Sequence, residues 1–392
     1  YWENLVKGVS GAAPITLFDS TNFKTKFACE VKNFNPLDHF EKKEAKKMDR
    51  NTQLGIVAAR EAVSHSRIIE DNVDKNRVGV IWGSGIGGLE TFETEVLGWA
   101  NSNNIPRFNP FFIPKMIADI TPGQISIEYG FHGPNYATVS ACASSANALI
   151  DAKMLLQLGK ADIIVCGGSE AAVTASGMGG FNSLMALSTR NDDYKTASRP
   201  FDKDRDGFVL GEGAGCIILE EYEHALKRGA TIYAELSGGG LSADAYHMTA
   251  PHPEGLGAFL VMKNCLDDAG LTPDEIDHIN MHGTSTPLGD IAESNAIAKL
   301  LGEHAYDIQI NSTKSMTGHL LGAAGVIEAI AAIGTIIYGI VPPTINHFTD
   351  DENIDSRLDF TFNHAVKKDV KVAISNTFGF GGHNACVLFK KL

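Results

Sequence analysis

The chain has 392 residues, of which 44% are apolar and 20% charged, and its 33 Lys and Arg against 47 Asp and Glu give a formal net charge of −14. This length and apolar share are enough for a large folded core of one or two domains, which excludes a disordered or collagenous chain. Six cysteines are too few for a disulfide-stapled small protein, and the acidic balance argues against a nucleic-acid partner.

Short β-branched runs alternate with longer segments rich in Ala and Leu, which is typical of an α/β protein with buried strands. The predicted strands, in chain order, are Val78–Trp82, Ala137–Ser140, Ile163–Gly167, Gly215–Glu221, Ile232–Gly238, His278–Met281, Val370–Asn376 and Asn384–Lys390. The predicted helices are Lys42–Ser66, Cys142–Leu158, Gly257–Ala269, Asp290–Leu301 and Leu320–Ile333.

One segment, Leu320–Val341, has Glu328 as its single charged residue and is long enough to cross a membrane. Because it contains four glycines and stands alone in the chain, we predict a helix buried inside a folded protein, running into a strand near Ile336–Val341. Residues Tyr1–Asn4 have neither the basic start nor the apolar core of a signal peptide. We therefore expect a cytoplasmic protein with no membrane span.

The run Gly83–Gly88 follows a predicted strand and matches the pattern GxGxxG. A dinucleotide site also requires an acidic residue about 20 residues further on, at the end of a second strand. Residues 98–104 contain neither an acidic residue nor a strand pattern. We therefore predict a tight, closely packed turn here and no nicotinamide site.

The cysteines form no Cys-x-x-Cys pair, which disfavours a zinc site and suits a reducing compartment. Cys142 differs from the others because it lies where a predicted strand meets a predicted helix, among small residues that leave room for a substrate. A helix start favours the thiolate and lowers its pKa, so we predict that Cys142 is a nucleophile. The remaining cysteines are interpreted as packing residues: Cys29, Cys166, Cys216, Cys265 and Cys386.

Two histidines stand in surroundings where ligand sites of α/β sheets gather. His282 directly follows the predicted strand His278–Met281, and His319 precedes a helix; both have glycine as a neighbour. Together with Cys142 they form a candidate site for attack on a carbonyl, in which charge on the oxygen needs donors. His247 and His252 resemble a metal pair, but no carboxylate lies at ligand spacing, so we predict no metal site.

The two candidate groups share a local arrangement that suggests a loose internal repeat. Thr138–Cys142 leads from a strand into a helix of small residues, and Ser312–His319 leads into another helix of that kind. Each run therefore delivers one reactive side chain to a helix start. The similarity of the two halves is suggestive and by itself no more than that.

Two further patterns each allow two interpretations. The glycine-rich run Phe378–Asn384 is either a plain turn between strands or a loop that presents backbone N–H groups and moves as a gate. Lys43, Lys46, Lys47 and Arg50 are three or four residues apart and share one face if they lie on a helix. From spacing alone, a solvated face partly paired with nearby glutamates is the favoured interpretation.

Taken in order, five motifs resemble those of the β-ketoacyl-[acyl-carrier-protein] synthases, and among them the synthase II type. The resemblance runs essentially from end to end of the chain. Any one motif alone arises by chance, whereas all of them in order do not. They are Ser140–Cys142, Ala197–Gly211, His282–Pro287, Lys314–His319 and Phe378–Gly382.

This resemblance implies a thiolase-like α/β fold, with two pseudo-duplicated βαβαβαββ halves stacked in five αβαβα layers, in a homodimer. Residues 1–230 would form the half with the nucleophile, including cap and dimer insertions, and residues 231–392 the half with both histidines. The family usually opens with a strand and a glycine-rich turn before the part that matches Tyr1, so we expect a longer native protein. His383 stands where threonine is common, which leaves the hydrogen bonding of that loop open.

The resemblance also implies roles for individual residues. Cys142 would be the acylated nucleophile, His282 and His319 the catalytic histidines, and Lys314 and Glu328 the residues that support them. Thr284 and Thr286 would contact the phosphopantetheine arm, and Ile86 would lie at the far end of the acyl pocket. Phe378 and Phe380 would form a gate, and the N–H groups of Phe380 and Cys142 would form an oxyanion hole. An acidic carrier protein would dock on Lys43, Lys46 and Lys47.

The implied reaction is a decarboxylative condensation in fatty-acid elongation, with acyl- and malonyl-acyl-carrier protein as partners. The acyl group is held on Cys142, and loss of carbon dioxide drives the formation of the carbon–carbon bond, so no cofactor and no metal are expected. Synthase I, a polyketide-type ketosynthase, a thiolase and a non-catalytic chain-length subunit are the alternatives. A thiolase would normally need a second catalytic cysteine, and the non-catalytic subunit would be expected to lack Cys142.

Overall fold

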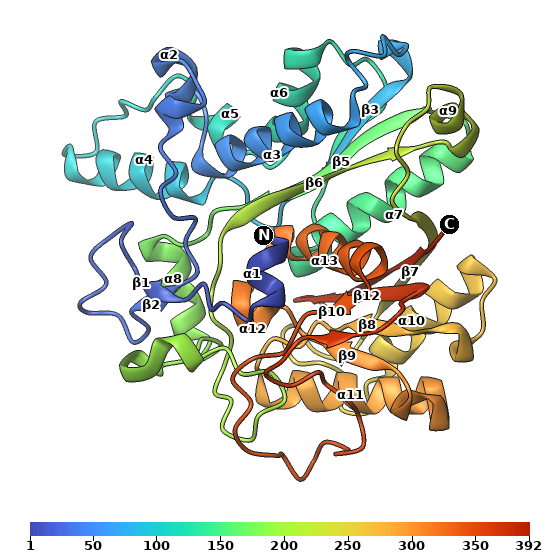
Figure 1. Ribbon diagram of the computed structural model, residues 1–392. Helices are drawn as coiled ribbons and strands as arrows, with labels where there is room; N and C mark the ends of the chain where they lie inside the picture. Colours follow the sequence, from blue (N-terminus) through green and yellow to red (C-terminus); the bar gives the residue numbers. More distant parts are fainter.

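The apolar β-branched runs form the strands of two mixed sheets, which the computed structural model describes together with all other residues, 1–392 (Figure 1). One sheet has the order β4-β3-β5-β6 and the other β7-β13-β12-β8-β9. The strands are β1 (Ala13–Pro14), β2 (Phe27–Ala28), β3 (Val78–Gly83), β4 (Asn135–Thr138), β5 (Ile163–Glu170), β6 (Gly213–Glu220), β7 (Glu235–Ala243), β8 (His278–Asn280), β9 (Gln309–Asn311), β10 (Ile340–Val341), β11 (Val366–Lys367), β12 (Val372–Gly379) and β13 (His383–Lys390).

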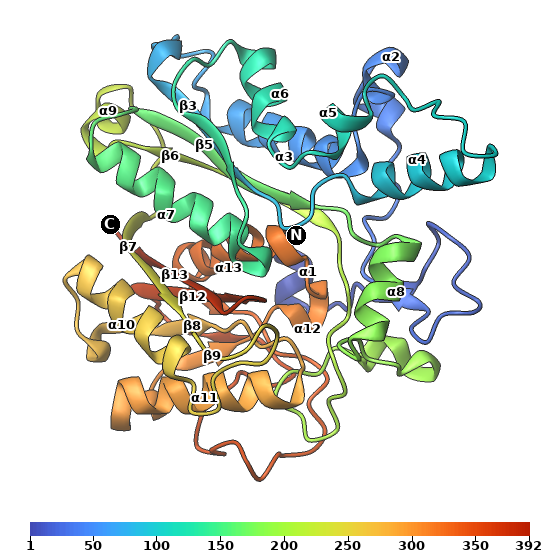
Figure 2. The ribbon, with the colours of Figure 1, turned by 180° about the vertical axis from the view of Figure 1, so that it is seen from behind.

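Helices separate the two sheets and cover their outer faces (Figures 1 and 2). Helices α3 and α6 pack on the outside of the first sheet, α7 and α13 lie between the sheets, and α10 packs on the second sheet with α11 beside it. The helices are α1 (Trp2–Val6), α2 (Lys42–Ala45), α3 (Arg50–Ser66), α4 (Leu89–Asn101), α5 (Phe112–Met116), α6 (Ile120–Tyr129), α7 (Ser144–Gln157), α8 (Ala175–Ser183), α9 (Tyr222–Lys227), α10 (Leu256–Ala269), α11 (Pro287–Leu301), α12 (Lys314–Thr317) and α13 (Ala324–Tyr338). The five-layer thiolase-like arrangement is therefore confirmed.

The two sheets repeat one pairing scheme. In the first sheet, β3 pairs in parallel with β4 and β5, and β5 pairs antiparallel with β6. In the second sheet, β8 pairs in parallel with β9 and β12, and β12 pairs antiparallel with β13. The second half follows the full series βαβαβαββ, starting from β7, whereas the first half has no counterpart of β7. Residues 78–220 supply the first sheet and residues 235–390 the second, and a domain division near residue 230 remains a prediction.

The internal repeat extends to the starts of the two central helices. A short 3-10 turn, Ala141–Ala143, precedes α7, and a second one, Leu321–Ala323, precedes α13. The first residue of each turn is left-handed, with φ of 51° at Ala141 and 47° at Leu321. Because non-glycine residues rarely adopt this conformation, the shared strain supports the repeat that the sequence suggested.

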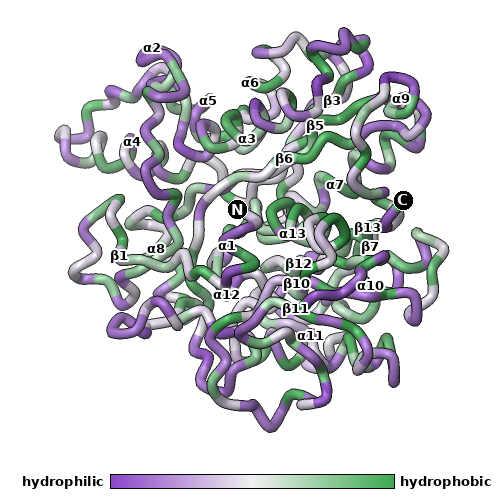
Figure 3. Tube along the Cα trace, in the orientation of Figure 1, coloured by the Kyte–Doolittle hydropathy of each residue, from purple (hydrophilic) through white to green (hydrophobic).

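Helix α13 is the apolar segment that has the length of a membrane span. It lies in the middle of the molecule, where Figure 3 shows it as strongly apolar, and 78% of the stretch Leu321–Tyr338 is buried. The prediction of a buried helix is confirmed. The predicted strand from Ile336 is wrong in its start, since the helix continues to Tyr338 and β10 begins only at Ile340.

The predicted helix Lys42–Ser66 is wrong as a single element. Helix α2 ends at Ala45, and α3 begins at Arg50. The break lies at Asp49, whose extended backbone and side chain cap the N-terminus of α3 by accepting the Asn51 N–H. A second hydrogen bond, from the Thr91 hydroxyl at 2.6 Å, fixes the buried Asp49 carboxylate in that place.

Candidate active site

Cys142 lies in the 3-10 turn between β4 and α7 and is nearly buried. The Ser144 hydroxyl holds this turn by donating to the Ala141 carbonyl and accepting the Ser140 N–H. Burial raises the pKa of the Cys142 thiol to about 12, although the charge of Lys314 acts in the opposite direction. A helix terminus contributes only about 0.3–1 kcal/mol, so the expected low thiol pKa is wrong for the resting site.

His319 is the immediate partner of the nucleophile. Its Nε2 atom lies 3.1 Å from Cys142 Sγ, and its backbone is held by a hydrogen bond from the His319 N–H to the Val209 carbonyl at 2.7 Å. Burial, and after it the charge of Lys314, holds the pKa of His319 well below its usual value. The resting pair is therefore a thiol that donates to a neutral imidazole, and not a thiolate–imidazolium pair.

His282 faces the same point from the end of β8. The centres of the two imidazole rings are 5.2 Å apart and the rings are nearly perpendicular. Burial, Lys314 and His319 together keep the pKa of His282 well below its usual value, so this ring is also neutral. Glu293 of α11 fixes the backbone here, because its carboxylate accepts the N–H groups of His282 and Gly283, both at 2.9 Å.

Glu293 gives a prediction for the pH dependence of stability. Burial raises its pKa from 4.5 to about 7, so in this interval the folded protein keeps a proton that the unfolded chain releases, and the free energy of unfolding falls as the pH rises. Between about pH 4.5 and 8, we expect wild type to lose about 3 kcal/mol relative to Glu293→Gln in urea titrations. Glu61→Gln, at an exposed position of α3, is the control. A difference between wild type and Glu293→Gln that stays constant with pH would contradict this prediction.

Behind the histidines, Lys314 and Glu328 form a buried ion pair, and each side chain is 1% exposed. Burial raises the pKa of Glu328 to about 7, against the opposing effect of Lys314. Lys314 also lowers the pKa of His282 and of His319. The pair therefore has an electrostatic effect on the site, because its cation adds to burial in keeping both imidazoles neutral.

Cys142, His282 and His319 line one cavity of about 560 Å³. The Thr284 and Thr286 hydroxyls, 3.0 Å apart, lie on its wall, and so do Phe378 and Phe380. The Phe380 N–H donates toward Cys142. A Cβ atom at Gly379 would lie 3.1 Å from the Cys142 nitrogen, so the loop approaches the nucleophile as closely as only glycine permits.

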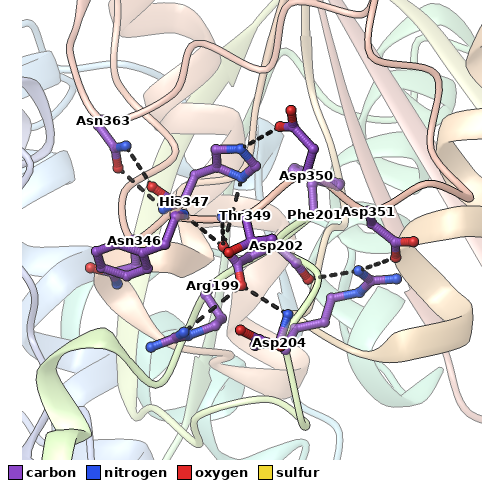
Figure 4. Close-up of polar contacts among 12 residues, drawn as sticks. Arg199, Phe201, Asp202, Asp204, Asn346, His347, Thr349, Asp350, Asp351 and Asn363 are labelled. Atoms are coloured by element: carbon purple, nitrogen blue, oxygen red, sulfur yellow. Dashed lines mark hydrogen bonds and ion pairs between the residues drawn. The ribbon is translucent and has the colours of Figure 1, made fainter.

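A polar network around Arg205 and Asp202 holds the threonine loop in place, and Figure 4 shows its part around Asp202. Arg205 donates to the carbonyl oxygens of Thr286 at 3.1 Å and Pro287 at 2.7 Å and pairs with Asp351 at 2.7 Å. Asp202, at the centre of Figure 4, accepts the backbone N–H groups of Phe348 and Thr349. The network thereby ties the 199–207 segment to the turn that carries both threonines.

Ile86 does not join the other predicted site residues. Its side chain is 41% exposed and is absent from the cavity wall. Its loop, the GxGxxG run, instead surrounds the buried carboxylate of Glu170, which accepts N–H groups of Gly85, Ile86, Gly87 and, from the second half, Gly322. The N–H groups of this turn are therefore bound to an internal carboxylate and not free for a nucleotide phosphate. After α4, where a dinucleotide fold needs a second strand, the chain forms α5 and α6.

Of the four basic residues predicted to share one face, three lie together at the surface and Arg50 does not. Lys43, Lys46 and Lys47 lie at the surface around the end of α2, and Lys47 pairs with Glu44 at 2.8 Å. Arg50 does not share their face: it turns inward and binds Glu212 at 2.6 Å. The interruption of the helix at Asp49 is the reason for this difference.

The comparisons with known proteins agree with this geometry. Residues 1–225 match the Beta-ketoacyl synthase, N-terminal domain, and residues 233–348 match the Beta-ketoacyl synthase, C-terminal domain. The chain belongs to the β-ketoacyl synthase family. It is 50% identical over 391 residues to 3-oxoacyl-[acyl-carrier-protein] synthase 2 of Staphylococcus aureus, with coverage of 100% of this chain and 93% of that relative.

A second relative and a solved structure are also similar to this chain over its full length. A 3-oxoacyl-[acyl-carrier-protein] synthase 2 of Synechocystis is 47% identical over 391 residues, again covering 100% of this chain and 93% of the relative. A type II PKS acyl-carrier protein in complex with its ketosynthase has a TM-score of 0.92 at 32% identity, covering 100% of this chain and 94% of the other. The fold of this β-ketoacyl synthase is thus shared by ketosynthases of different product classes.

In this β-ketoacyl synthase, sequence reasoning missed the buried polar residues that position the site. Glu293, Arg205 and Glu170 bind backbone atoms of the His282, Thr286 and Gly85 turns. A signal was present for Glu293, because a charged residue lay inside a predicted helix among Ala and Ile. For Arg205 and Glu170 the sequence offered no comparable signal, since their partners are distant in the chain.

Proposed function

We propose that this protein is a 3-oxoacyl-[acyl-carrier-protein] synthase that condenses a Cys142-bound acyl group with malonyl-acyl-carrier protein in fatty-acid elongation. The observation that carries the proposal is the 3.1 Å contact between Cys142 Sγ and His319 Nε2, with His282 beside it in one cavity. The names of the relatives that are about half identical over the full chain support this substrate class.

The first step is transfer of the acyl group to the enzyme. The Cys142 thiol gives its proton to His319 Nε2 as the sulfur attacks the thioester carbonyl. The N–H groups of Cys142 and Phe380 stabilise the negatively charged oxygen by donating hydrogen bonds to it. The carrier thiolate then leaves and takes the proton from His319. The products are acyl-Cys142 and a free carrier thiol, so the imidazole is neutral again.

The second step uses both imidazoles as donors. In the acyl-enzyme the sulfur has no proton to donate to His319 Nε2, so the neutral His319 ring can carry its own proton on Nε2 after exchange with water. The N–H of each neutral ring can then stabilise the enolate oxygen of malonyl-carrier protein as carbon dioxide leaves. The enolate carbon attacks the acyl-Cys142 carbonyl, and the Cys142 thiolate leaves and takes up a proton from water. The product is a 3-oxoacyl thioester two carbons longer.

Neutral histidines suit this step better than charged ones. Lys314 lies close enough to lower the pKa of both rings, and its own charge is balanced by Glu328. A neutral imidazole donates a hydrogen bond to the developing enolate without already binding the malonyl carboxylate as a counter-ion. The carboxylate therefore remains free to depart as carbon dioxide.

We also propose a cytoplasmic homodimer. Strand β4 is an edge of its sheet, and exposed apolar side chains accompany it: Val139 follows the strand with 63% exposure and Ile127 lies on the adjacent α6 with 75% exposure. An open edge with apolar neighbours is a surface on which a second copy can continue the sheet. Sedimentation at about twice the 42.0 kDa chain mass is expected, and sedimentation as a monomer would contradict the proposal.

For docking of the carrier protein we propose Lys43, Lys46 and Lys47. The double variant Lys43→Glu/Lys46→Glu is expected to raise the KM for acyl-carrier protein about tenfold at low salt, with less effect at high salt, because the carrier is acidic. Lys263→Glu/Lys299→Glu makes the same charge change at exposed positions on α10 and α11 and is the matched control. Equal effects of both double variants would exclude a local docking surface.

The reaction itself is tested with acyl-carrier protein and radiolabelled malonyl-carrier protein. We expect 3-oxoacyl-carrier protein and carbon dioxide in equal amounts, and no 3-oxoacyl product would overturn the proposal. A polyketide-type ketosynthase is the second candidate because the similar solved structures include one. A profile over acyl chain lengths separates the two, since saturated acyl primers should be used by the elongation enzyme.

A further inference from the structure

The wall of the active-site cavity is acidic. It includes the carboxylates of Asp206, Asp244, Asp290 and Glu293, and none of its residues is Lys or Arg. A phosphopantetheine arm that reaches Cys142 from outside carries a phosphate near the opening of this cavity. A phosphate at this opening meets carboxylates and uncharged donors but no cation, so a cation close to the opening would strengthen its binding.

The opening is marked by the cavity-lining residues that are most exposed. Met185 is 83% exposed, and Met248 and Leu288 are also largely exposed. Met185 follows α8 and adopts a left-handed backbone with φ of 55°. Its side chain therefore stands at the rim of the cavity, with solvent on one side.

Next to this rim lies a second, smaller cavity of about 230 Å³. Met185 and Asp206 line both cavities, so the two adjoin at these residues. Lys24 lines the smaller one, is exposed, and takes part in no ion pair. It is the single Lys or Arg on the walls of either cavity.

Apart from Lys24 and the Asp206 carboxylate, the polar side chains of the small cavity are uncharged. Thr189 brings a hydroxyl, and its N–H already holds Asp206 Oδ2 at 3.1 Å. Asn182 is 8% exposed; its Oδ1 accepts the Thr25 N–H at 2.9 Å, and its Nδ2 has no hydrogen-bond partner in the protein. A lysine cation, a hydroxyl and an amide thus gather within one small space.

We propose that Lys24 and the small cavity form a subsite for the phosphate of the phosphopantetheine arm, beside the opening of the active-site cavity. This inference rests on the proposed function. The Lys24 ammonium would bind the phosphate directly, and the Thr189 hydroxyl would donate a second hydrogen bond. Asp206 then divides the phosphate subsite from the path of the acyl chain.

Two histidines on the wall of the active-site cavity, His247 and His252, are the other candidates for binding the phosphate. His247 Nδ1 accepts the N–H groups of Thr249 and Ala250, and His252 Nδ1 accepts the N–H of Glu254. In each ring the proton therefore resides on Nε2. A neutral N–H binds a phosphate less strongly than an ammonium group does, so Lys24 is the stronger candidate.

The test compares two small substrates that differ only in the phosphate: octanoyl-phosphopantetheine and octanoyl-pantetheine. The second-order rate constant for acylation of Cys142 is measured for each by intact mass. In wild type we expect a ratio of about three to five in favour of the phosphate, decreasing with added salt. Lys24→Ala should reduce the ratio to about one, while Lys24→Arg should retain it.

Lys26→Ala is the matched control, because Lys26 is equally exposed two residues further on but lines neither cavity, and it should keep the wild-type ratio. An unchanged ratio in Lys24→Ala overturns the subsite. If the ratio is lost in His252→Ala and kept in Lys24→Ala, the phosphate binds at His252, and this result also overturns the proposed Lys24 subsite. A wild-type ratio of one would contradict the phosphate subsite alone. Failure of both substrates to acylate Cys142 would contradict the proposed function.

Discussion

Replacement of Cys142 by Ala is expected to abolish condensation while malonyl-carrier protein is still decarboxylated. The variant lacks the sulfur that accepts the acyl group, so the carbon–carbon bond cannot form. His282, His319 and Lys314 keep their positions, because the Cys142 side chain supplies only one hydrogen bond to them, at 3.1 Å to His319. Product formation and release of carbon dioxide are measured separately.

Cys216→Ala serves as the control for this variant, since Cys216 lies half-buried in β6, away from the cavity. It should condense at the wild-type rate within about twofold. Condensation by Cys142→Ala at a substantial rate would contradict the role of the nucleophile. Loss of decarboxylation together with condensation would contradict the separate role of the histidines.

The largest effect on stability is expected from Glu328→Gln. Both members of the Lys314–Glu328 pair are 1% exposed, and removal of one leaves the charge of the other uncompensated in the interior. We expect the free energy of unfolding to fall by about 3–5 kcal/mol in urea titrations. A loss below about 1 kcal/mol would show that Lys314 is not held as a buried cation.

The double variant Lys314→Met/Glu328→Leu separates stability from chemistry. Two apolar side chains of similar volume should restore most of the lost stability. The pKa of both histidines should then rise, since Lys314 lowers it in the wild type, and condensation should remain impaired with a pH profile shifted upward. Recovery of full activity with stability would assign the pair a purely structural role.

The strands and long helices were predictable because their patterns are local. Val78–Trp82 and Ile163–Gly167 are continuous apolar runs, and both are buried strands in parallel pairing. β9, with three residues, carries too little pattern to be recognised, and α4 and α6 lacked a predicted counterpart. The break at Asp49 depends on a hydrogen bond to Thr91, which sequence spacing does not reveal.

The reactive side chains were predictable because each stands at the junction of a strand or turn with a helix. The structure brings Cys142, His282 and His319 together. Their protonation was not predictable: the neutral thiol follows from burial, and the neutral imidazoles follow from burial and from Lys314, which are properties of the folded interior. Ile86 remains a prediction as a pocket residue, because the cavity of a single chain does not include it.

The most direct test of the central claim is the mass of the intact protein after incubation with an acyl-carrier protein, followed by peptide mapping of the six cysteines. We predict an increase by one acyl group, located on Cys142, that disappears when malonyl-carrier protein is added. Absence of an adduct, or an adduct on another cysteine with Cys142 free, would contradict the account.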